Sequence, residues 1–574
     1  MTRLDTFRSA LAVAAVAALT LPAGLNGRSK VDNFRRGGPH DWSHGRLIAT
    51  RFGPDLDRNV DRDWRTHLKH VRLDQARALE TSPVVTWFDL LQKALGGDRE
   101  PANTASKLDW NLKTGGFGNV VGSPAKYSFD ITASHCSDVI YFTVNQAGSA
   151  TSPNVIAITN AYAGCSGNTS GTTPTVKWGI RMTSGTATSA VPSLDGTVLY
   201  VLESGASSVV LHAINVNNIT SNPGTYSFGS TNWSNAHILA APSGTATSEQ
   251  LFQLTFSGVV NNVSSPYLDY DSNEIYFGDS SGHIRHVVNV DRTSASVDST
   301  NFANTCGTSQ LQSPIFVNDQ VIVTSYDGRL YRMDTNSASP YTCIASALGG
   351  VGGGGAGALA PPVVDVTNNV VIVGTNNASG FGIAGIGTFD LMFTAGAGFV
   401  SAVQTGAATT TAPVSPTFDD AFWSTNSGNA YAVGSPTGGG NTYLVRVPYN
   451  GSLGTASGFA QLNHTSTGAI VAASPVTEFL TASSQANKDF LFVGGAGTNY
   501  LYMNRIGAGF GGTNASPVSM ANSFSVTGGI ISGISVDTRT SNITGSTATA
   551  NIYFGTMGVG TTTQSTIVQL AQQF

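Results

Sequence analysis

The sequence contains little charge, and that charge is unevenly placed. Charged residues make up 11% of the 574 positions, with a formal net charge of −5. Residues 1–100 hold 16 basic and 12 acidic residues, which leaves 13 basic and 22 acidic residues in 101–574. A protein that binds nucleic acid needs a basic surface to neutralise phosphates. We therefore expect no nucleic-acid partner.

Long apolar runs are also missing. No stretch reaches the roughly 18 apolar residues that a helix needs to cross a bilayer, so no transmembrane segment is predicted. The apolar run at 10–21 follows Arg3 and Arg8 and ends at Pro22-Ala23-Gly24. A basic start, a short apolar core and a small residue at its end are typical of a secretory signal. We predict that residues 1–23 are a signal peptide and that the protein is periplasmic or extracellular.

Cysteine is rare, with only Cys136, Cys165, Cys306 and Cys343. None lies at the boundary of the N-terminal apolar run, so no lipoprotein anchor is expected. No pair has the C-x-x-C spacing of many zinc sites, and an even count in a secreted chain favours disulfides. We predict one disulfide between Cys136 and Cys165 within a structural repeat, and another between Cys306 and Cys343 across adjacent repeats.

A weak repeat begins before residue 130 and continues to the C-terminus. Each copy has a Pro step, an apolar strand, a polar turn, a second strand such as "IYFG" at 275–278 or "LYVL" at 199–202, and a third strand. About eight copies are present, and their alternating apolar and polar residues are typical of half-buried strands. This predicts an all-β, closed β-propeller of eight four-stranded blades. Seven blades remain the alternative, because residues 224–263 obscure where the second copy ends.

The two ends of the repeat array predict how the ring closes. Trp110 in "KLDWNLKTGG" precedes the first copy as Trp178 in "TVKWGIRMTSG" precedes the second. The last copy lacks a fourth strand, so residues 107–112 are expected to complete it, which removes an exposed sheet edge. The propeller is therefore assigned to 107–574. Residues 24–106 are a charged, partly helical segment with two expected amphipathic helices at 61–80 and 82–97. We expect them to pack on one face, with a pro-segment or a partner dock as the alternative.

The stretch "SPIFVNDQVIVTSYDGRLYRMDT" at 313–335 resembles the repeat of quinoprotein-like propellers, a family that includes pyrroloquinoline-quinone dehydrogenases and an outer-membrane assembly scaffold. "SLDGTVLYVLE" at 193–203 is similar to the surface-layer type of repeat, and the whole run looks like uncharacterised secreted propellers of soil bacteria. The dehydrogenases carry a Trp-docking motif in most blades, which here is matched only at Trp110 and Trp178. Adjacent cysteines and a haem-binding C-x-x-C-H are absent. The resemblance therefore implies the fold without a quinone cofactor.

Candidate metal ligands are few. Asp269, Asp271 and Asn273 could bind Ca²⁺ through oxygen, but the sixth and twelfth positions of an EF-hand loop are here Glu274 and Ser280. The stretch also occupies a first-to-second strand turn, where Asp and Asn are favoured. We predict a turn and no cofactor, with Ca²⁺ as the one ion for which weak candidates exist.

Other motifs are weaker still. His40 with His44, and His67 with His70, would share a helix face but lack a third ligand. His283 and His286 are predicted on opposite faces of a strand. The glycine run at 349–357 lacks the Lys and helix of a phosphate loop and is interpreted as an inter-blade loop.

The sequence contains no G-x-S-x-G elbow at a strand-to-helix turn. The leading prediction is therefore non-enzymatic. It is a monomeric secreted module that binds or scaffolds a protein or a polar ligand such as a glycan on its loop face. The alternative is a secreted oxidoreductase or hydrolase with its site in the central channel, built from single residues of several blades that look isolated in the sequence.

Overall fold

The computed structural model describes residues 38–40 and 47–48, and residues 106–572 except for 130–134, 163–164, 166–173, 187, 220–232, 234–235, 239–246, 260–261, 349–358, 379–382, 408–413, 420, 423–426, 435–442, 462–471, 482–487, 497–499, 506–528, 531, 538–549 and 559–563. Regular structure in these ranges is almost entirely β-strand. The predicted signal peptide, the two predicted helices, the glycine run at 349–357 and three of the paired histidines (His44, His67 and His70) lie outside the described residues.

Eight sheets follow one another along the described chain, and we number them as blades one to eight. Blade one contains β4 (Ala125–Ser128), β5 (Val139–Thr143), β6 (Val155–Thr159) and β7 (Thr175–Arg181); blade two contains β8 (Val191–Pro192), β9 (Val198–Ser204), β10 (Ser208–Asn215) and β12 (Gln250–Ser257). Blade three contains β13 (Tyr267–Asp269), β14 (Glu274–Gly278), β15 (Ile284–Val288) and β16 (Ser296–Val297); blade four contains β17 (Ile315–Val317), β18 (Gln320–Thr324), β19 (Arg329–Asp334) and β20 (Cys343–Leu348).

The remaining blades follow the same plan. Blade five contains β21 (Val363–Asp365), β22 (Val370–Ala378), β23 (Ile383–Asp390) and β24 (Phe399–Ala407); blade six contains β25 (Thr417–Phe418), β26 (Gly428–Gly434), β27 (Tyr443–Tyr449) and β28 (Gly458–Gln461). Blade seven differs: β29 (Ala472–Ala473) and β30 (Thr477–Thr481) pair in succession with one edge of β31 (Lys488–Ala496), and β32 (Tyr500–Arg505) pairs with its other edge, so its described residues form three strand positions. Blade eight contains β33 (Ser535–Asp537), β34 (Ala550–Gly555), β35 (Thr566–Gln572) and β3 (Ser106–Lys113).

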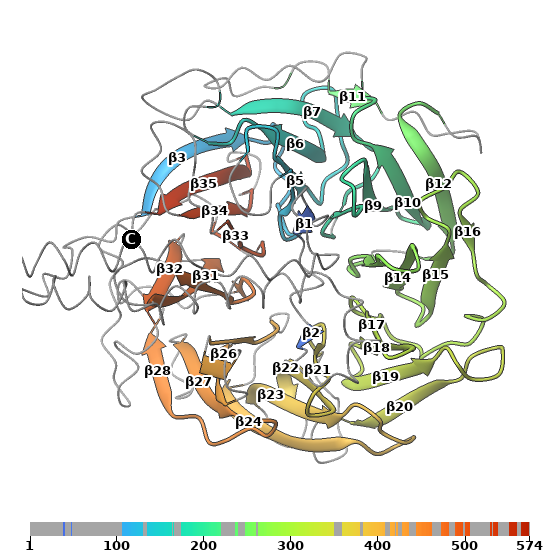
Figure 1. Cartoon of the computed structure of the whole chain (residues 1–574), viewed down its shortest axis with the longest axis vertical. Coiled ribbons are helices and arrows are strands. Elements are labelled where there is room, and N and C mark those ends of the chain that lie inside the picture. Colours follow the sequence, from blue (N-terminus) through green and yellow to red (C-terminus); the bar gives the residue numbers. More distant parts are fainter. Residues whose placement is uncertain are drawn as a thin grey trace, which may run out of the picture.

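The sheets are arranged radially around a common centre (Figure 1). Their short first strands lie toward the centre, and the last strands, such as β12, β20 and β24, lie at the rim. This is the β-propeller architecture that the repeat predicts. Three further strands extend the blades: β1 (Gly38–His40) pairs with β4, β2 (Leu47–Ile48) with β21, and β11 (His237–Ile238) with the rim strand β7. The fourth strand of blade two, which the sequence obscures, is β12.

The rim strand of blade eight comes from the beginning of the array. β3 pairs antiparallel with β35, with Leu112 opposite Ile567, as expected for residues 107–112. The Trp110 indole donates a hydrogen bond to the carbonyl of Ala161 (3.3 Å), just beyond the third strand of blade one. Trp178 in blade one donates in the same way to Val216 (3.1 Å), just beyond the third strand of blade two. The two tryptophans therefore occupy equivalent positions in consecutive blades.

The core lies between neighbouring blades, since each sheet is covered on both faces. In β5 all five residues are buried; Val139 and Tyr141 pack toward blade two, whereas Ile140 and Phe142 pack with Trp110 and Tyr553 of blade eight. The predicted alternation of apolar and polar residues therefore does not hold in the second strands. A strand between two sheets needs apolar side chains on both faces.

The "IYFG" motif of the repeat has a packing cause. A glycine lies at or near the end of the second strand in several blades. The chain segment that connects one blade to the next passes directly over this glycine. An added Cβ on Gly278 would lie 2.5 Å from the Leu311 side chain, and one on Gly374 would lie 2.1 Å from the Val414 carbonyl oxygen. The same holds for Gly555, whose Cβ would lie 2.1 Å from Val120. Blades one and four have Thr143 and Thr324 here, and their hydroxyls donate to the connection at Thr188 and Ala360.

Candidate functional site

The weak Ca²⁺ candidates Asp269, Asp271 and Asn273 lie in or beside the turn between β13 and β14. Asp269 ends β13, and its carboxylate accepts hydrogen bonds from the Asp271 amide (3.2 Å) and the Ser272 hydroxyl (2.7 Å). Asn273 has a positive φ of 55°, a conformation that Asn tolerates well. These residues form the predicted turn. Among the residues that the structure describes, no three His, Cys, Asp or Glu side chains are grouped to hold a metal ion.

The predicted histidine pairs do not form ligand pairs where they are described. His40 lies in strand β1 rather than in a helix. His283 precedes β15, with its Nδ1 3.7 Å from Asp279, whereas His286 lies within β15 and contacts Glu274 and Asp298. His283 therefore lies outside the strand on which the sequence predicts both residues, and the two histidines contact different carboxylates.

His286 belongs to an acid–imidazole cluster in blade three. Its Nδ1 lies 3.2 Å from Asp298 Oδ2, and its Nε2 lies 3.3 Å from Glu274 Oε2, close enough for an ion pair but not aligned as a hydrogen bond. The imidazole stacks on Tyr276 with the ring centroids 4.5 Å apart, and the Tyr276 hydroxyl donates to Glu274 (2.7 Å). Tyr276 also stacks on Phe316 of blade four, so the cluster joins two blades.

The electrostatics of this cluster favour ionised carboxylates. Burial raises the pKa of Glu274, but the His286 ring and the Tyr276 hydroxyl outweigh it and hold that pKa below its ordinary value. Burial also raises the pKa of Asp298, and hydrogen bonds from Asn301 and His286 reverse the effect. Both imidazole nitrogens face carboxylates, so the ring is held in place rather than positioned to activate a hydroxyl.

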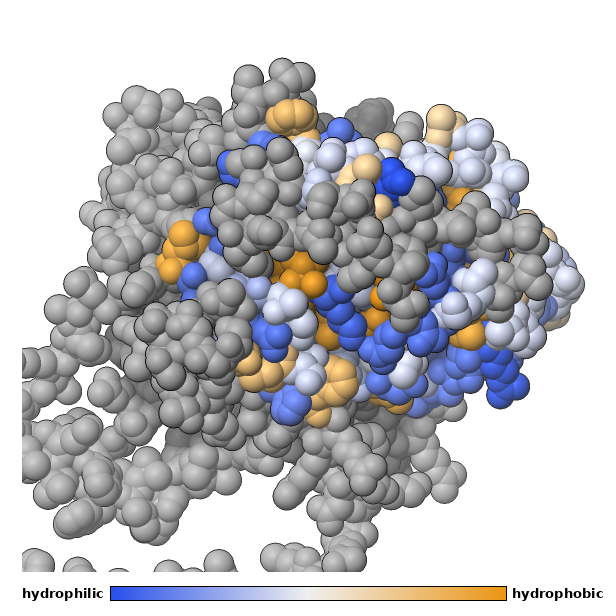
Figure 2. Space-filling model, turned by 90° about the horizontal axis from the view of Figure 1, so that it is seen from above, coloured by the Kyte–Doolittle hydropathy of each residue, from blue (hydrophilic) through white to orange (hydrophobic). Residues whose placement is uncertain are grey.

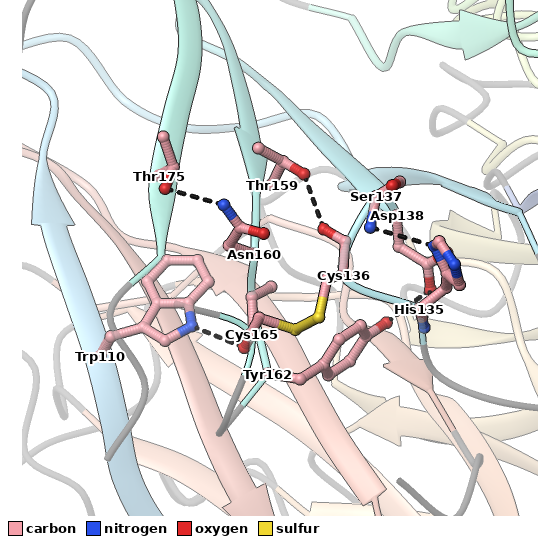
Figure 3. The surroundings of a disulfide bond; sticks show 11 residues. Trp110, His135, Cys136, Ser137, Asp138, Thr159, Asn160, Tyr162, Cys165 and Thr175 are labelled. Carbon is pink, nitrogen blue, oxygen red and sulfur yellow. Dashed lines mark hydrogen bonds between the residues drawn. A yellow bond between two sulfur atoms is a disulfide. The ribbon is translucent and has the colours of Figure 1, made fainter. Parts of the chain in front are cut away.

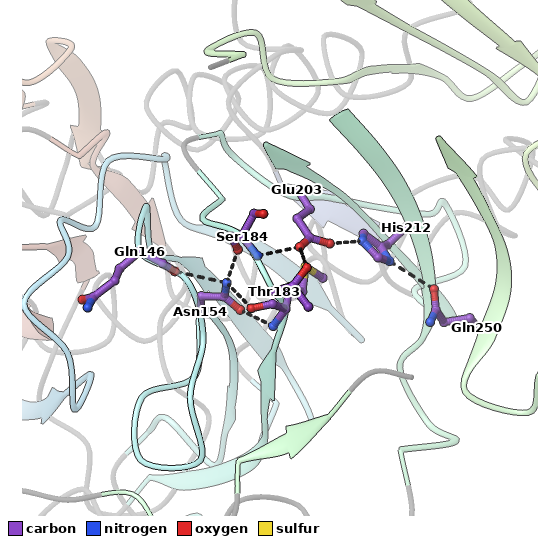
Figure 4. Close-up of polar contacts among 8 residues, drawn as sticks. Gln146, Asn154, Thr183, Ser184, Glu203, His212 and Gln250 are labelled. Atoms are coloured by element: carbon purple, nitrogen blue, oxygen red, sulfur yellow. Dashed lines mark hydrogen bonds and ion pairs between the residues drawn. The ribbon is translucent and has the colours of Figure 1, made fainter. Parts of the chain in front are cut away.

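A second polar network joins blades one and two. Glu203 at the end of β9 accepts hydrogen bonds from the Thr183 hydroxyl (2.7 Å) and the Ser184 amide (2.6 Å), which lie in the connection between the blades (Figure 4). Its other oxygen contacts His212 Nε2 at 2.8 Å, and His212 Nδ1 lies 3.2 Å from Gln250 Oε1. Burial raises the pKa of Glu203, but the contacts from His212, Thr183 and Ser184 leave it lowered.

This network is a structural clamp. His212 is only 3% exposed, and both of its ring nitrogens are engaged. Asn154 extends the network, since its side-chain amide donates to the Ser184 carbonyl (2.6 Å) and its oxygen accepts from the Met182 amide (2.8 Å) (Figure 4). Sequence reasoning missed the pair of Glu203 and His212. The sequence signal for this pair is two polar residues in an otherwise apolar hairpin, one on each strand. They lie on the same face of the sheet because Glu203 is opposite Val210 and His212 is two residues further along that strand.

Both predicted disulfides are present. Cys136 bonds to Cys165 within blade one, and Cys306 to Cys343 between blades three and four, with Cα–Cα distances of 5.2 and 5.3 Å. Beside the first (Figure 3), the Tyr162 hydroxyl donates to Asp138 (2.8 Å). Asp138 also pairs with Lys126 of β4 (3.1 Å), and both charged side chains are buried. The turns of blade one are therefore held by a covalent bond, with a buried ion pair beside it.

Two exposed apolar side chains lie in the turns of blades one and two. We define the turn face as the side formed by the turns that join first to second strands and third to fourth strands. Phe129 (40% exposed) and Leu194 (42% exposed) lie on it in blades one and two. Their two turns contact one ring, because the Phe129 ring packs against Tyr127 (5.2 Å between centroids) and the backbone at Gly196, two residues after Leu194, packs on the same Tyr127 ring. On the side of the molecule that Figure 2 shows, hydrophobic residues form small separate groups among hydrophilic and neutral ones.

The comparisons with known proteins concern the fold. No family model and no curated protein matches the sequence. Among solved structures, Chaetomium thermophilum Sqt1 aligns with 81% of this chain and 98% of its own, at 13% identity and a TM-score of 0.47. Saccharomyces cerevisiae Sqt1 aligns over 82% and 100% (10% identity, TM-score 0.45), and BamB from Moraxella catarrhalis over 82% and 98% (10% identity, TM-score 0.30). None of the helices in the described residues has the length and apolar character to cross a membrane.

Proposed function

We propose that this chain is a secreted, monomeric β-propeller whose eight blades are closed into a ring by β3, and that it binds a protein partner on its turn face. In this proposal it is a member of the quinoprotein-like propellers that has no quinone, residues 1–23 direct its secretion, and the two disulfides suit an oxidising compartment. A glycan is the alternative ligand for the same face.

The observation that carries the proposal is the pair of exposed apolar side chains Phe129 and Leu194. Large apolar residues that lie together at the surface mark interaction sites more often than scattered ones do. The supporting structure beneath them is rigid, because Tyr127 is fixed between the two turns and Asp138 is tied to Lys126 and Tyr162. A rigid support lowers the ordering cost of binding.

The test measures partner binding by a double variant that carries both Phe129→Asp and Leu194→Asp. A single variant, Val400→Asp, is the control. Val400 is 57% exposed on the rim strand β24 and is the matched control. A partner is first identified by cross-linking the full chain in the medium of its own cells, and its affinity is then measured with purified proteins. We expect the double variant to bind at least about tenfold more weakly and the control to bind like the wild type. Equal affinities for all three chains would contradict the proposal, and stoichiometric Ca²⁺ or a visible absorber in the purified protein would favour an enzyme.

A further inference from the structure

Two short strands from the N-terminal segment lie at the inner edges of two distant blades. β1 pairs antiparallel with β4 of blade one, with Gly38, Pro39 and His40 opposite Ser128, Tyr127 and Lys126. β2 pairs parallel with β21 of blade five, with Leu47 and Ile48 opposite Val364 and Asp365. Figure 1 shows both strands, in dark blue, on the central side of their blades. The first strand of each of these blades therefore has another strand on its inner side.

The two contacts belong to one short stretch of chain. Seven residue steps join His40 to Leu47, which reach at most about 25 Å. The inner edges of blades one and five therefore face each other across the centre within that distance. Three blades separate them in chain order, so residues 38–48 connect blades that do not touch as neighbours.

The pairing of β1 depends on the main chain. Pro39 has no N–H, so its pairing with Tyr127 cannot be one in which both residues exchange hydrogen bonds. In an antiparallel ladder, hydrogen-bonded pairs alternate with pairs that are not hydrogen-bonded. The two hydrogen-bonded pairs are therefore Gly38 with Ser128 and His40 with Lys126. The amides of Lys126 and Ser128 then point toward β1, and the amide of Tyr127 points toward β5. An edge of this kind accepts an extended peptide with little demand on its side chains.

Both acceptor edges are held rigid by buried charges at the residues in register with the added strands. Lys126, opposite His40, forms its ion pair with Asp138. Asp365, opposite Ile48, is fully buried and accepts hydrogen bonds from the Tyr449 hydroxyl of blade six (2.8 Å) and from the Asn368 side chain (2.7 Å). Pre-organised edges bind an incoming strand at a lower entropic cost.

We propose that the inner edges of β4 and β21 are a binding site for an extended peptide strand, and that Gly38–His40 and Leu47–Ile48 of the same chain occupy this site in cis. The recognised chemistry is an unpaired peptide backbone, and a competing strand gains access only when β1 and β2 leave. The inference does not rest on the turn-face partner, since it requires no partner protein.

The test uses a labelled synthetic peptide of residues 36–50 and three forms of the full chain. One variant carries His40→Pro, Leu47→Pro and Ile48→Pro, which leaves Gly38 as the one residue of β1 and β2 with a backbone N–H. The matched control carries Ala at the same three positions and keeps every N–H. We expect the peptide to bind the proline variant at least about tenfold more tightly than the wild type or the alanine control, because a tethered strand has a millimolar effective concentration. Absence of binding to the proline variant, or equal binding to all three, would overturn the proposal.

Hydrogen exchange provides a second readout that needs no variant to fold. In the wild type the amides of Lys126 and Ser128 should exchange at least about tenfold more slowly than unstructured amides, because β1 pairs with this edge of β4. The alanine control should show the same protection, and the free peptide should restore it in the proline variant. Unprotected Lys126 and Ser128 amides in the wild type would show that the edge is open and would refute cis occupancy.

Discussion

The glycine near the end of the second strand provides the sharpest test of how blades pack together. In blade five, Gly374 lies in β22 and Gly387 in the adjacent β23. A Cβ on Gly374 would lie 2.1 Å from the Val414 carbonyl oxygen, about 1.3 Å short of the 3.4 Å at which ordinary contact begins. A Cβ on Gly387 would meet nothing closer than 3.7 Å. The two positions therefore differ mainly in the approach of the connection to blade six.

The expected magnitudes follow from this difference. Gly374→Ala must displace backbone at Val414, and overpacking of this kind costs about 1–3 kcal/mol. Restricting the unfolded chain returns about 0.4–1 kcal/mol to any Gly→Ala change. We therefore expect Gly374→Ala to lower the free energy of unfolding by about 1–2 kcal/mol, and Gly387→Ala to raise it by about 0.4–1 kcal/mol.

The assay is equilibrium unfolding in urea with the disulfides intact, followed by tryptophan fluorescence and by near-ultraviolet circular dichroism. The two probes should give one transition for each protein, and the midpoint of Gly374→Ala should lie below those of the wild type and Gly387→Ala. If both variants unfold at the same urea concentration, the connection does not need the glycine and the explanation of the repeat motif is wrong.

Three further predictions concern buried polar contacts and covalent links. Tyr449→Phe removes a donor from the buried Asp365 carboxylate, so we expect a loss of about 1–3 kcal/mol in a urea titration; a change below about 0.3 kcal/mol would mean that the contact is absent in solution. Folding lowers the pKa of Glu203, Glu274 and Asp298. The ionised carboxylates therefore stabilise the folded protein at neutral pH, and this contribution is lost as the pH falls below about 4 and they become protonated. Thermal midpoints measured from pH 7 to pH 3 should therefore fall at the acid end, and less steeply in Glu203→Gln. Replacing Cys306 and Cys343 together by Ser should cost about 2–4 kcal/mol, and an unchanged urea midpoint would contradict the cross-blade role of this disulfide.

Features with a strong local chemical signature could be predicted from the sequence. Trp110 and Trp178 occur in matching contexts, which predicts a rim strand around Trp110, and β3 lies there and pairs with β35. The cysteine spacings likewise led to both disulfides. In each case a rare residue type marks a position that common residues cannot fill.

Other features depend on partners that are distant in the sequence. Glu203 and His212 look like ordinary strand residues until the hairpin and the connection of blade one bury them together. β1 and β2 contain only three and two residues, so they have no measurable alternation, and their strand conformation comes from the edges that they join. In β5 the positions expected to be polar are occupied by Ile140 and Phe142, because neighbouring blades cover both faces of this strand.

The pairing of β3 with β35 has a consequence for how the molecule is made. Thr114 and Ser565, which are hydrogen-bonded at the end of this pairing, are 451 residues apart in the chain. During synthesis, β3 emerges among the first strands of the array, long before its partner β35. Contacts of such long range form slowly. Blade eight can therefore be completed only after β35 has been synthesised, and until then β3 lacks its partner strand while Lys107, Asp109 and Lys113 along it oppose premature association.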